Sequence, residues 1–324
     1  MALLACVWGK TVQAQVDPHF SQYYIQPMTM NPAFTGAFDG DYRVSAIWRS
    51  QYGNTLNTRG ISAEKTTNKN ANIGFNLINQ VSNDGAYSFT NGYLTFAYTG
   101  VRFGRNYDHY LVMALQMGFI SRKFDVNKMQ FGSQWISGVG FDASSNSNET
   151  FLKPQVTSFD AGAGIAYYDA TPNQTASIFG GIAAYHITQP VNPFLSDQNQ
   201  SKLNIRYSVQ AGVRITASDQ LTIVPTAIYM KQGDAQERMG GVYFQVYASE
   251  TTDVMFGAYY RINDAYTPFA GFYYKGLTFG LSYDVDASAK TAAGSKGNSL
   301  EVSLSYTGKR KSNMGVPRFW CPRF

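Results

Sequence analysis

The chain has 324 residues, of which 15% are aromatic and only 15% are charged, against roughly 25% charged residues in soluble domains. It contains 30 glycines, and no apolar run approaches the roughly 18 residues of a transmembrane helix. The net charge of +5 equals that of residues 309–324, which hold five Lys or Arg and no acid. This balance excludes a basic nucleic-acid-binding surface and a helical membrane protein, and it favours one large β architecture.

Residues 1–14 are predicted to be the end of a signal peptide. Ala2 to Trp8 is a short apolar segment, and Ala14 provides the small residue that cleavage before Gln15 requires. A lipoprotein signal ending at Cys6 is the alternative, but it leaves no apolar core. If Cys6 departs with the signal, Cys321 is the one remaining cysteine, which excludes an intramolecular disulfide and a cysteine-based metal site.

Residues 15–40 are predicted to form an extended N-terminal strap ahead of the first strand. The stretch from Asp17 to Gly36 is too rich in proline for a central strand and too aromatic for a free linker. Two alternatives follow: the strap packs inside a barrel or along its periplasmic rim, or it contacts a partner directly. The candidate partner-binding residues in the strap are Asp17, Pro18, Phe20, Ser21, Gln22, Tyr23, Asn31, Pro32, Ala33 and Gly36.

Strict alternation of apolar and polar residues predicts β-strands from Tyr42 onwards. In residues 203–216, Leu203, Tyr207 and Val209 fall on one face, and Ser208 falls on the other. A strand of about thirteen residues at roughly 3.3 Å each, tilted by about 45°, spans about 30 Å of membrane. We expect fourteen strands, near residues 41–50, 57–66, 70–80, 87–99, 108–120, 155–169, 175–188, 203–216, 220–230, 237–249, 252–262, 266–275, 277–286 and 298–307.

The connections between these strands favour a closed barrel. Even-numbered connections are mostly short, as at Gly276, whereas odd-numbered ones include the long segments 121–154, 189–202 and 287–297. Short periplasmic turns that alternate with longer external loops are typical of outer-membrane barrels. Residues 41–308 are therefore predicted to form an all-β, integral outer-membrane antiparallel barrel of about 14 strands, with both termini periplasmic. A secreted β-sandwich or propeller is the alternative.

Residues 309–324 are predicted to form a basic and aromatic C-terminal tail. Aromatic side chains are costly to leave exposed, and the prolines at 317 and 322 favour an extended backbone. The tail is either a disordered end or a segment that docks on a partner or on the barrel. Its candidate partner-binding residues are Phe319, Trp320, Arg323 and Phe324.

Patterns that would indicate catalysis or cofactor binding are missing. His19, His109 and His186 lie far apart without metal-ligand spacing, and each is predicted to be an interfacial or lumenal polar residue. The glycines at 162–164 lie within an alternating strand and face one way with Asp160, which predicts a tight lumen or a plug pressed against the wall. We therefore predict no enzyme, no cofactor, no metal site and no nucleic-acid partner.

The strap also resembles a known family. The run Asp17-Pro18, Phe20-Ser21-Gln22-Tyr23, then Asn31-Pro32-Ala33 and Gly36, is similar to the start of the mature chain in the PorP/SprF outer-membrane proteins of type IX secretion. The resemblance covers most of the chain, including a Cys321-Pro322-Arg323-Phe324 ending seen in some relatives. It implies a fourteen-stranded outer-membrane barrel of Bacteroidota that works in type IX secretion or gliding motility.

The resemblance implies two kinds of partner besides outer-membrane lipid. One is a secreted cargo protein, such as a large surface adhesin, and the other is a set of periplasmic components of the secretion apparatus. The predicted function is therefore a non-enzymatic protein that binds cargo and helps export or surface-anchor it, or that contacts the apparatus. Two alternatives stay open: a diffusion pore, which the polar face of residues 204–214 permits, and a hydrolase at the barrel rim around one histidine.

Overall fold

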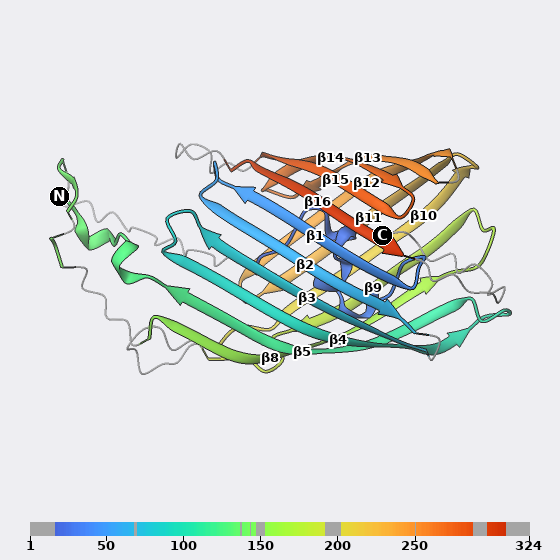
Figure 1. Cartoon of the computed structure of the whole chain (residues 1–324), viewed down its shortest axis with the longest axis horizontal. Coiled ribbons are helices and arrows are strands. Elements are labelled where there is room, and N and C mark those ends of the chain that lie inside the picture. Colours follow the sequence, from blue (N-terminus) through green and yellow to red (C-terminus); the bar gives the residue numbers. More distant parts are fainter. Residues whose placement is uncertain are drawn as a thin grey trace, which may run out of the picture.

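The computed structural model describes residues 17–67, 70–136, 138–142, 144–146, 153–191, 202–249, 251–287 and 297–308. Fourteen antiparallel strands close into a barrel, which confirms the predicted fold class (Figure 1). Among the described residues, no helix is long and apolar enough to cross a membrane. The barrel strands are β1 (Tyr42–Gln51), β2 (Leu56–Thr66), β3 (Ala71–Ser82), β4 (Tyr87–Phe103), β5 (His109–Phe124), β8 (Gln155–Asp169), β9 (Ala176–Tyr185), β10 (Arg206–Ser218), β11 (Leu221–Gln232), β12 (Ala235–Ser249), β13 (Thr252–Arg261), β14 (Ala265–Tyr274), β15 (Leu277–Asp286) and β16 (Ser299–Gly308).

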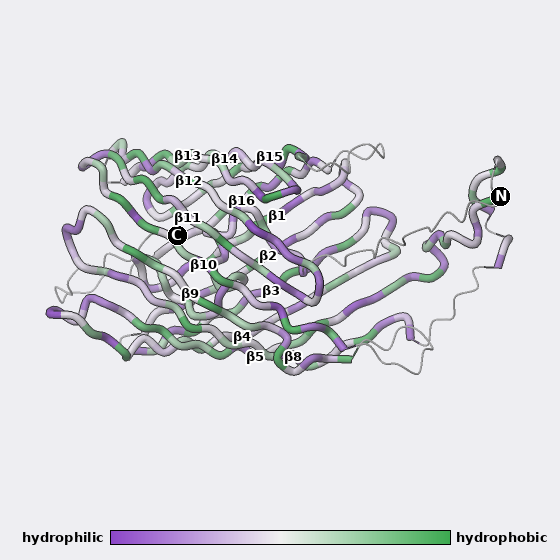
Figure 2. Tube along the Cα trace, turned by 180° about the vertical axis from the view of Figure 1, so that it is seen from behind, coloured by the Kyte–Doolittle hydropathy of each residue, from purple (hydrophilic) through white to green (hydrophobic). Residues whose placement is uncertain are grey.

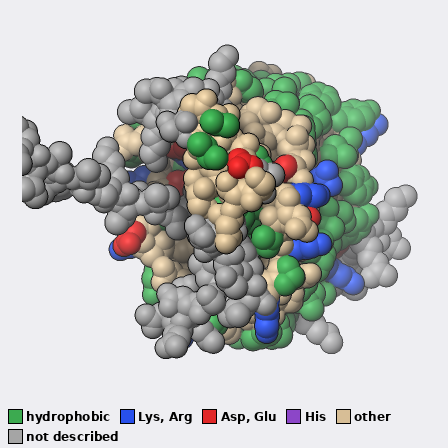
Figure 3. Space-filling view, turned by 90° about the vertical axis from the view of Figure 1, so that its left-hand side faces the viewer, with side chains coloured by type: hydrophobic (Ala, Val, Ile, Leu, Met, Phe, Trp, Pro, Cys, Tyr) green, Lys and Arg blue, Asp and Glu red, His purple; other side chains and the backbone are tan. Residues whose placement is uncertain are grey.

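The alternating pattern separates a lumenal face from an outer face along each strand. In β10, Val209 is 43% exposed on the outside, whereas Ser208 is 1% exposed inside. In β16, Leu304 and Tyr306 point outward, and Glu301 is buried in the lumen. Figure 2 shows hydrophobic and hydrophilic segments alternating along the strands. The outer wall seen in Figure 3 is largely hydrophobic, with charged side chains around the end of the barrel, as a membrane-embedded barrel requires.

One predicted strand begins later than expected. Residues 203–216 were expected to form a strand with Leu203 on the outer face, but β10 begins at Arg206. Leu203 is only 9% exposed and packs inside the barrel with Phe89, Tyr93 and Ile120. The expectation for Leu203 was wrong because the segment before β10 turns inward to bury this apolar side chain.

The two ends of the barrel differ in their connections. The strands that meet at one end, here called the long-connection end, are joined by residues 125–154, 186–205 and 287–298. Residues 125–154 include the short helices η4 (Val126–Lys128) and η5 (Gly132–Gln134) and the hairpin of β6 (Trp135–Ile136) and β7 (Gly140–Phe141). The other end, the short-turn end, carries tight connections such as residues 275–276 between β14 and β15.

The strap crosses the lumen from one end to the other (Figure 1). Asp41 N donates to Gly308 O over 2.9 Å at the short-turn end, where β1 begins and β16 ends. Asp17 N donates to Gln232 Oε1 over 2.9 Å near the long-connection end. The predicted signal peptide 1–14 and tail 309–324 lie outside the described residues, so the placement of the termini stays a prediction.

Candidate functional site

The strap fills the lumen as three short 3₁₀ turns. They are η1 (Tyr23–Ile25), η2 (Pro27–Thr29) and η3 (Pro32–Phe34). Proline stands first in η2 and η3, where its missing N–H and fixed φ suit a helix start. Asn31 Oδ1 accepts from Ala33 N over 2.9 Å and caps η3. The sequence thus folds into compact turns that present side chains to the barrel wall on all sides.

Aromatic side chains form the apolar centre of the filled lumen. The rings of Tyr23 and Tyr259 lie 5.4 Å apart between centroids, and those of Tyr24 and Phe269 lie 5.5 Å apart. The Tyr23 hydroxyl and Thr226 Oγ1 are hydrogen-bonded over 2.6 Å. Buried tyrosines keep a hydrogen-bond partner because an unpaired hydroxyl is costly. Together these contacts hold η1 against β11, β13 and β14.

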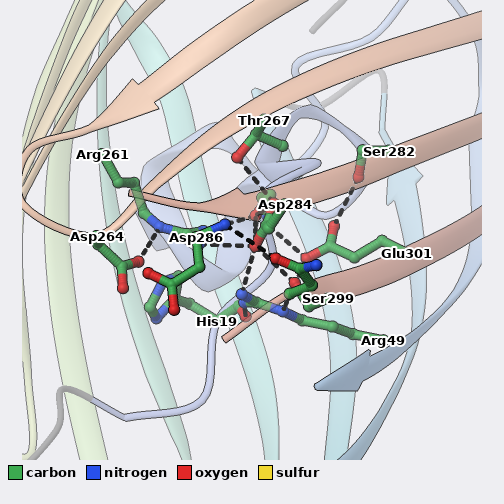
Figure 4. A network of polar contacts seen from close by, with 12 residues as sticks. His19, Arg49, Arg261, Asp264, Thr267, Ser282, Asp284, Asp286, Ser299 and Glu301 are labelled. Carbon is green, nitrogen blue, oxygen red and sulfur yellow. Dashed lines mark hydrogen bonds and ion pairs between the residues drawn. The ribbon is translucent and has the colours of Figure 1, made fainter. Parts of the chain in front are cut away.

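A buried acid and arginine network anchors the strap near the long-connection end (Figure 4). Asp284 accepts from Arg49 Nη2 over 2.7 Å, from Arg261 Nη2 over 2.6 Å and from Ser21 Oγ over 3.0 Å. The Glu301 carboxylate accepts from the Ser21 backbone N over 2.8 Å. These residues come from β1, β13, β15 and β16, so one strap segment joins strands across the closure of the barrel. Removing one member of such a buried network leaves an unpaired charge.

A second anchor joins the start of the strap to β8 and to the segment after β9. His186 Nδ1 lies 2.8 Å from Asp160 Oδ2, and His186 Nε2 is hydrogen-bonded to Asp17. Both ring nitrogens face carboxylates, so both donate and the ring is an imidazolium. Burial raises the pKa of Asp17, but the charge and hydrogen bond of His186 outweigh it and hold that pKa below its usual range. Tyr93 donates to Asp160 over 2.6 Å and completes this anchor.

The middle of the strap is pressed against β8 and β9. Asn31 Nδ2 donates to Ile165 O over 3.1 Å and to Ile182 O over 3.3 Å. A Cβ added to Gly164 would lie 2.1 Å from Asn31 Oδ1, and one added to Gly181 would lie 2.4 Å from Asn31 Nδ2. The absence of a side chain at these two glycines lets Asn31 reach the wall. The structure therefore bears out the expectation, drawn from residues 162–164, of a plug pressed against the wall.

The predicted site residues of the strap lie together in the lumen. All are buried except Pro18, which is half-buried, and they contact the barrel. Partner binding by these residues is not tested and stays a prediction. The tail residues Phe319, Trp320, Arg323 and Phe324 lie outside the described part of the chain.

The sequence reasoning missed the barrel residues that hold the strap. Arg49, Arg261, Asp284 and Glu301 were not singled out, and neither was the pairing of His186 with strap residue Asp17. A usable signal was present, since each is a charged or ionisable residue on or beside the inward face of a charge-poor strand. In the described part of the chain, no group of three or more His, Cys, Asp or Glu side chains is arranged to hold a metal ion.

Comparison with known proteins identifies the family and the general fold. The family model described as type IX secretion system membrane protein PorP/SprF matches residues 12–306. No curated protein matches the chain. Similar solved structures include the P. putida toluene transporter TodX, with 8% identity, coverage of 89% of this chain and 94% of that chain, and a TM-score of 0.50. The Ralstonia pickettii toluene transporter TbuX has 9% identity, coverage of 86% and 92%, and a TM-score of 0.49.

The two kinds of match carry different weight. At 8% identity, TodX shows a shared barrel fold alone. The family model covers most of the chain, including the strap that fills the lumen. This chain therefore belongs to the PorP/SprF family of type IX secretion system membrane proteins.

Proposed function

We propose that this outer-membrane barrel is a non-enzymatic docking protein of type IX secretion or gliding. It binds a secreted cargo protein, such as an adhesin, and helps export it or hold it at the cell surface, or it contacts the secretion apparatus. The observation that carries the proposal is the filled lumen. A barrel whose interior is occupied by its own strap offers its two ends as binding surfaces for other proteins.

The filled lumen also disfavours the diffusion pore. A solute pathway needs a continuous polar opening, whereas the strap buries its aromatic rings against the wall and binds charged residues of β1, β2, β10, β12, β13, β15 and β16. A cavity beside the strap, lined by Tyr24, Phe38, Arg43 and Gln245 among others, has a volume of about 60 Å³. That volume holds a few water molecules and is far smaller than the roughly 300–1,000 Å³ of ordinary ligand pockets.

The experiment is capture of the tagged protein from native outer membranes in mild detergent, followed by mass spectrometry. We expect a secreted cargo protein, or periplasmic components of the apparatus, to remain bound. An unrelated barrel with the same tag and expression level is the control, and it should capture neither.

Single-channel conductance in planar bilayers tests the alternative function. The purified protein should show no steady open-channel current. Recovery of an isolated barrel that conducts steadily would overturn the docking proposal in favour of a pore.

A further inference from the structure

The strand β8 has an unpaired edge at the long-connection end. Pairing of β5 with β8 continues to Lys123 opposite Gln155. Pairing of β8 with β9 stops at Ala163 opposite Ala184. Among the described residues, positions 155–162 of β8 therefore have a neighbouring strand on one side only, and β8 projects beyond the end of β9.

Two hydrogen bonds show which backbone groups of β8 face β5 and which face the open side. Phe124 N donates to Pro154 O over 2.8 Å, so even-numbered positions of this stretch face β5. Ile187 N donates to Ala161 O over 3.0 Å, so odd-numbered positions face the open side. In an antiparallel strand, the N–H and C=O of one residue point to the same neighbour. Thr157 and Phe159 thus direct their backbone groups away from β5, toward the open edge.

The segment after β9 turns away from this edge. His186 has a φ of 58° and is drawn into the lumen by Asp17 and Asp160. The described residues that follow reach β8 only through Ile187 N and through Thr188 Oγ1, which lies 2.9 Å from Asp160 Oδ1 and 3.3 Å from Phe159 O. Beyond these contacts, no backbone hydrogen bond of the described residues crosses the open side of residues 155–159.

The edge lacks the features by which proteins usually protect free strands. Residues 155–159 read Gln-Val-Thr-Ser-Phe, without charge or proline, and are rich in strand-forming types. The Phe159 side chain is 63% exposed on the outer face. An unprotected edge of this kind is a template for an added strand.

We propose that the open edge of β8 at residues 155–159 receives an extended strand of the secreted cargo protein, by β-strand addition. This inference rests on the proposed docking function and names its surface. The binding groups are alternating backbone N–H and C=O groups, which only an extended backbone matches at every second residue.

The ends of the chain itself are poor occupants of the edge. Residues 309–324 follow Gly308, at the opposite end of the barrel. The predicted cleavage leaves only Gln15 and Val16 ahead of Asp17, too few for a strand. With both ends of the chain excluded, the secreted cargo is the occupant that the proposed function supplies, and hydrogen exchange tests it against internal residues of the chain.

Hydrogen exchange on the purified protein in detergent is the first test. The amides of Thr157 and Phe159 should exchange at least ~10-fold faster than those of Ser158 and Asp160, which face β5. Equal protection of all four amides would show that the chain itself, for example through residues 192–201, or a second copy already covers the edge. That result would overturn the inference.

A pair of variants provides the second test. Thr157→Pro removes the N–H on the open side and leaves the β5–β8 pairing intact, because proline is tolerated on an edge strand. Thr157→Ala removes the side chain and keeps the N–H. In the capture experiment, Thr157→Pro should recover at least ~10-fold less of the cargo found with the wild type, and Thr157→Ala should recover as much as the wild type. Unchanged heat-dependent gel migration verifies that both barrels fold.

The outcomes separate the two proposals. If the wild type and Thr157→Pro recover equal cargo, the edge inference fails and the docking function stands. If the wild type recovers no secreted protein, the docking function fails and the inference falls with it. Should Thr157→Pro not assemble, hydrogen exchange on the captured wild-type complex decides the question. The amides of Thr157 and Phe159 must then become protected, and unchanged exchange would contradict the inference.

Discussion

The strap meets two unlike walls inside the barrel. Toward β8–β16 and β1, it is held by polar bonds along its length, from Asp284 and Glu301 to Thr226 and the carbonyls that bind Asn31. On the other side, Gly36 N donates to Glu64 Oε2 over 2.9 Å and Asn72 Nδ2 donates to Thr35 O over 3.1 Å. Toward β4 and β5, η3 packs without such bonds. The buried inward atoms without a hydrogen-bond partner among the described residues include Ser62 Oγ, Asn76 Oδ1, Asn91 Oδ1, Thr95 Oγ1 and both amide atoms of Gln116.

This contrast between the walls indicates which contacts hold the strap in place. A buried polar atom that is left unpaired costs about 1–3 kcal/mol, whereas a hydrogen bond to a charged group contributes about 1.5–3 kcal/mol. The β8–β16 wall therefore holds most of the strap, β2 and β3 hold its last residues, and the β4–β5 wall only encloses it. Changes to the first wall should loosen the strap, and apolar changes to the second should leave it in place.

The largest effect is expected at the acid and arginine network. Asp284→Ala leaves Arg49 and Arg261 as buried charges without their shared carboxylate, so it should lower the free energy of unfolding by about 3–5 kcal/mol. Urea unfolding in detergent, followed by tryptophan fluorescence, measures this loss. Protease sensitivity of the strap should rise in parallel.

Asp264 provides a matched control on the same arginine. It accepts from Arg261 Nε over 2.6 Å, but its side chain is 59% exposed. Exposed ion pairs contribute about 0–1 kcal/mol, so Asp264→Asn should cost less than 1 kcal/mol. Equal losses for the two variants would show that burial of the network is not what anchors the strap.

The next effect concerns the first residue of the anchored strap. Asp17→Asn should cost about 1.5–3 kcal/mol at pH 7, because it removes the charged partner of His186. The pKa of Asp17 is lowered in the folded state, so its contribution is present above the unfolded pKa of roughly 3.9 and is lost as the pH falls through the folded value. The gap between wild type and variant should therefore persist from pH 7 to pH 5 and shrink at pH 3. Unfolding curves at these three values measure it, and a gap that widens from pH 5 to pH 3 would contradict the assignment.

The strands could be predicted from sequence because their pattern is local. A barrel strand alternates between lipid and lumen at every residue, so β8 and β15 have the bounds that the pattern predicts. Prediction failed where a tertiary contact overrode the pattern. Leu203 continues the alternation of β10, yet it is buried with Phe89 and Tyr93 because the chain leaves the barrel wall before Arg206.

The strap contacts could be predicted only in part. The glycines near 162–164 indicated something pressed against the wall, and the aromatic residues of the strap indicated docking. No local pattern links Asn31 to the carbonyls of Ile165 and Ile182, because that pairing depends on how the strap threads the closed barrel. The same holds for Ser21 and Asp284, which are separated by 263 positions in the chain.

A moderate effect is expected where the strap touches the glycine wall. Gly164→Ala places a methyl group 2.1 Å from Asn31 Oδ1, so Asn31 must leave the two carbonyls that it binds. Overpacking of this kind costs about 1–3 kcal/mol. Gly240→Ala is the control, since its added Cβ meets only Thr226 O at 3.8 Å. Unfolding free energies of the two variants should differ by most of that cost, and hydrogen exchange should increase in η3 only for Gly164→Ala.

The smallest effect is expected when the same Thr→Val change is made on each of the two walls. Thr226→Val removes the nearer of the two hydrogen-bond partners of the Tyr23 hydroxyl on the anchored wall, so it should cost about 0.5–1.5 kcal/mol. Thr95→Val removes a hydroxyl that has no partner among the described residues, so it should be neutral or stabilising by up to about 1 kcal/mol. Both changes replace a hydroxyl by a methyl group. A difference between their effects on the free energy of unfolding therefore reflects the wall on which each threonine lies. If Thr95→Val destabilises the protein as much as Thr226→Val does, the β4–β5 wall holds the strap through bonded water, and the contrast between the walls disappears.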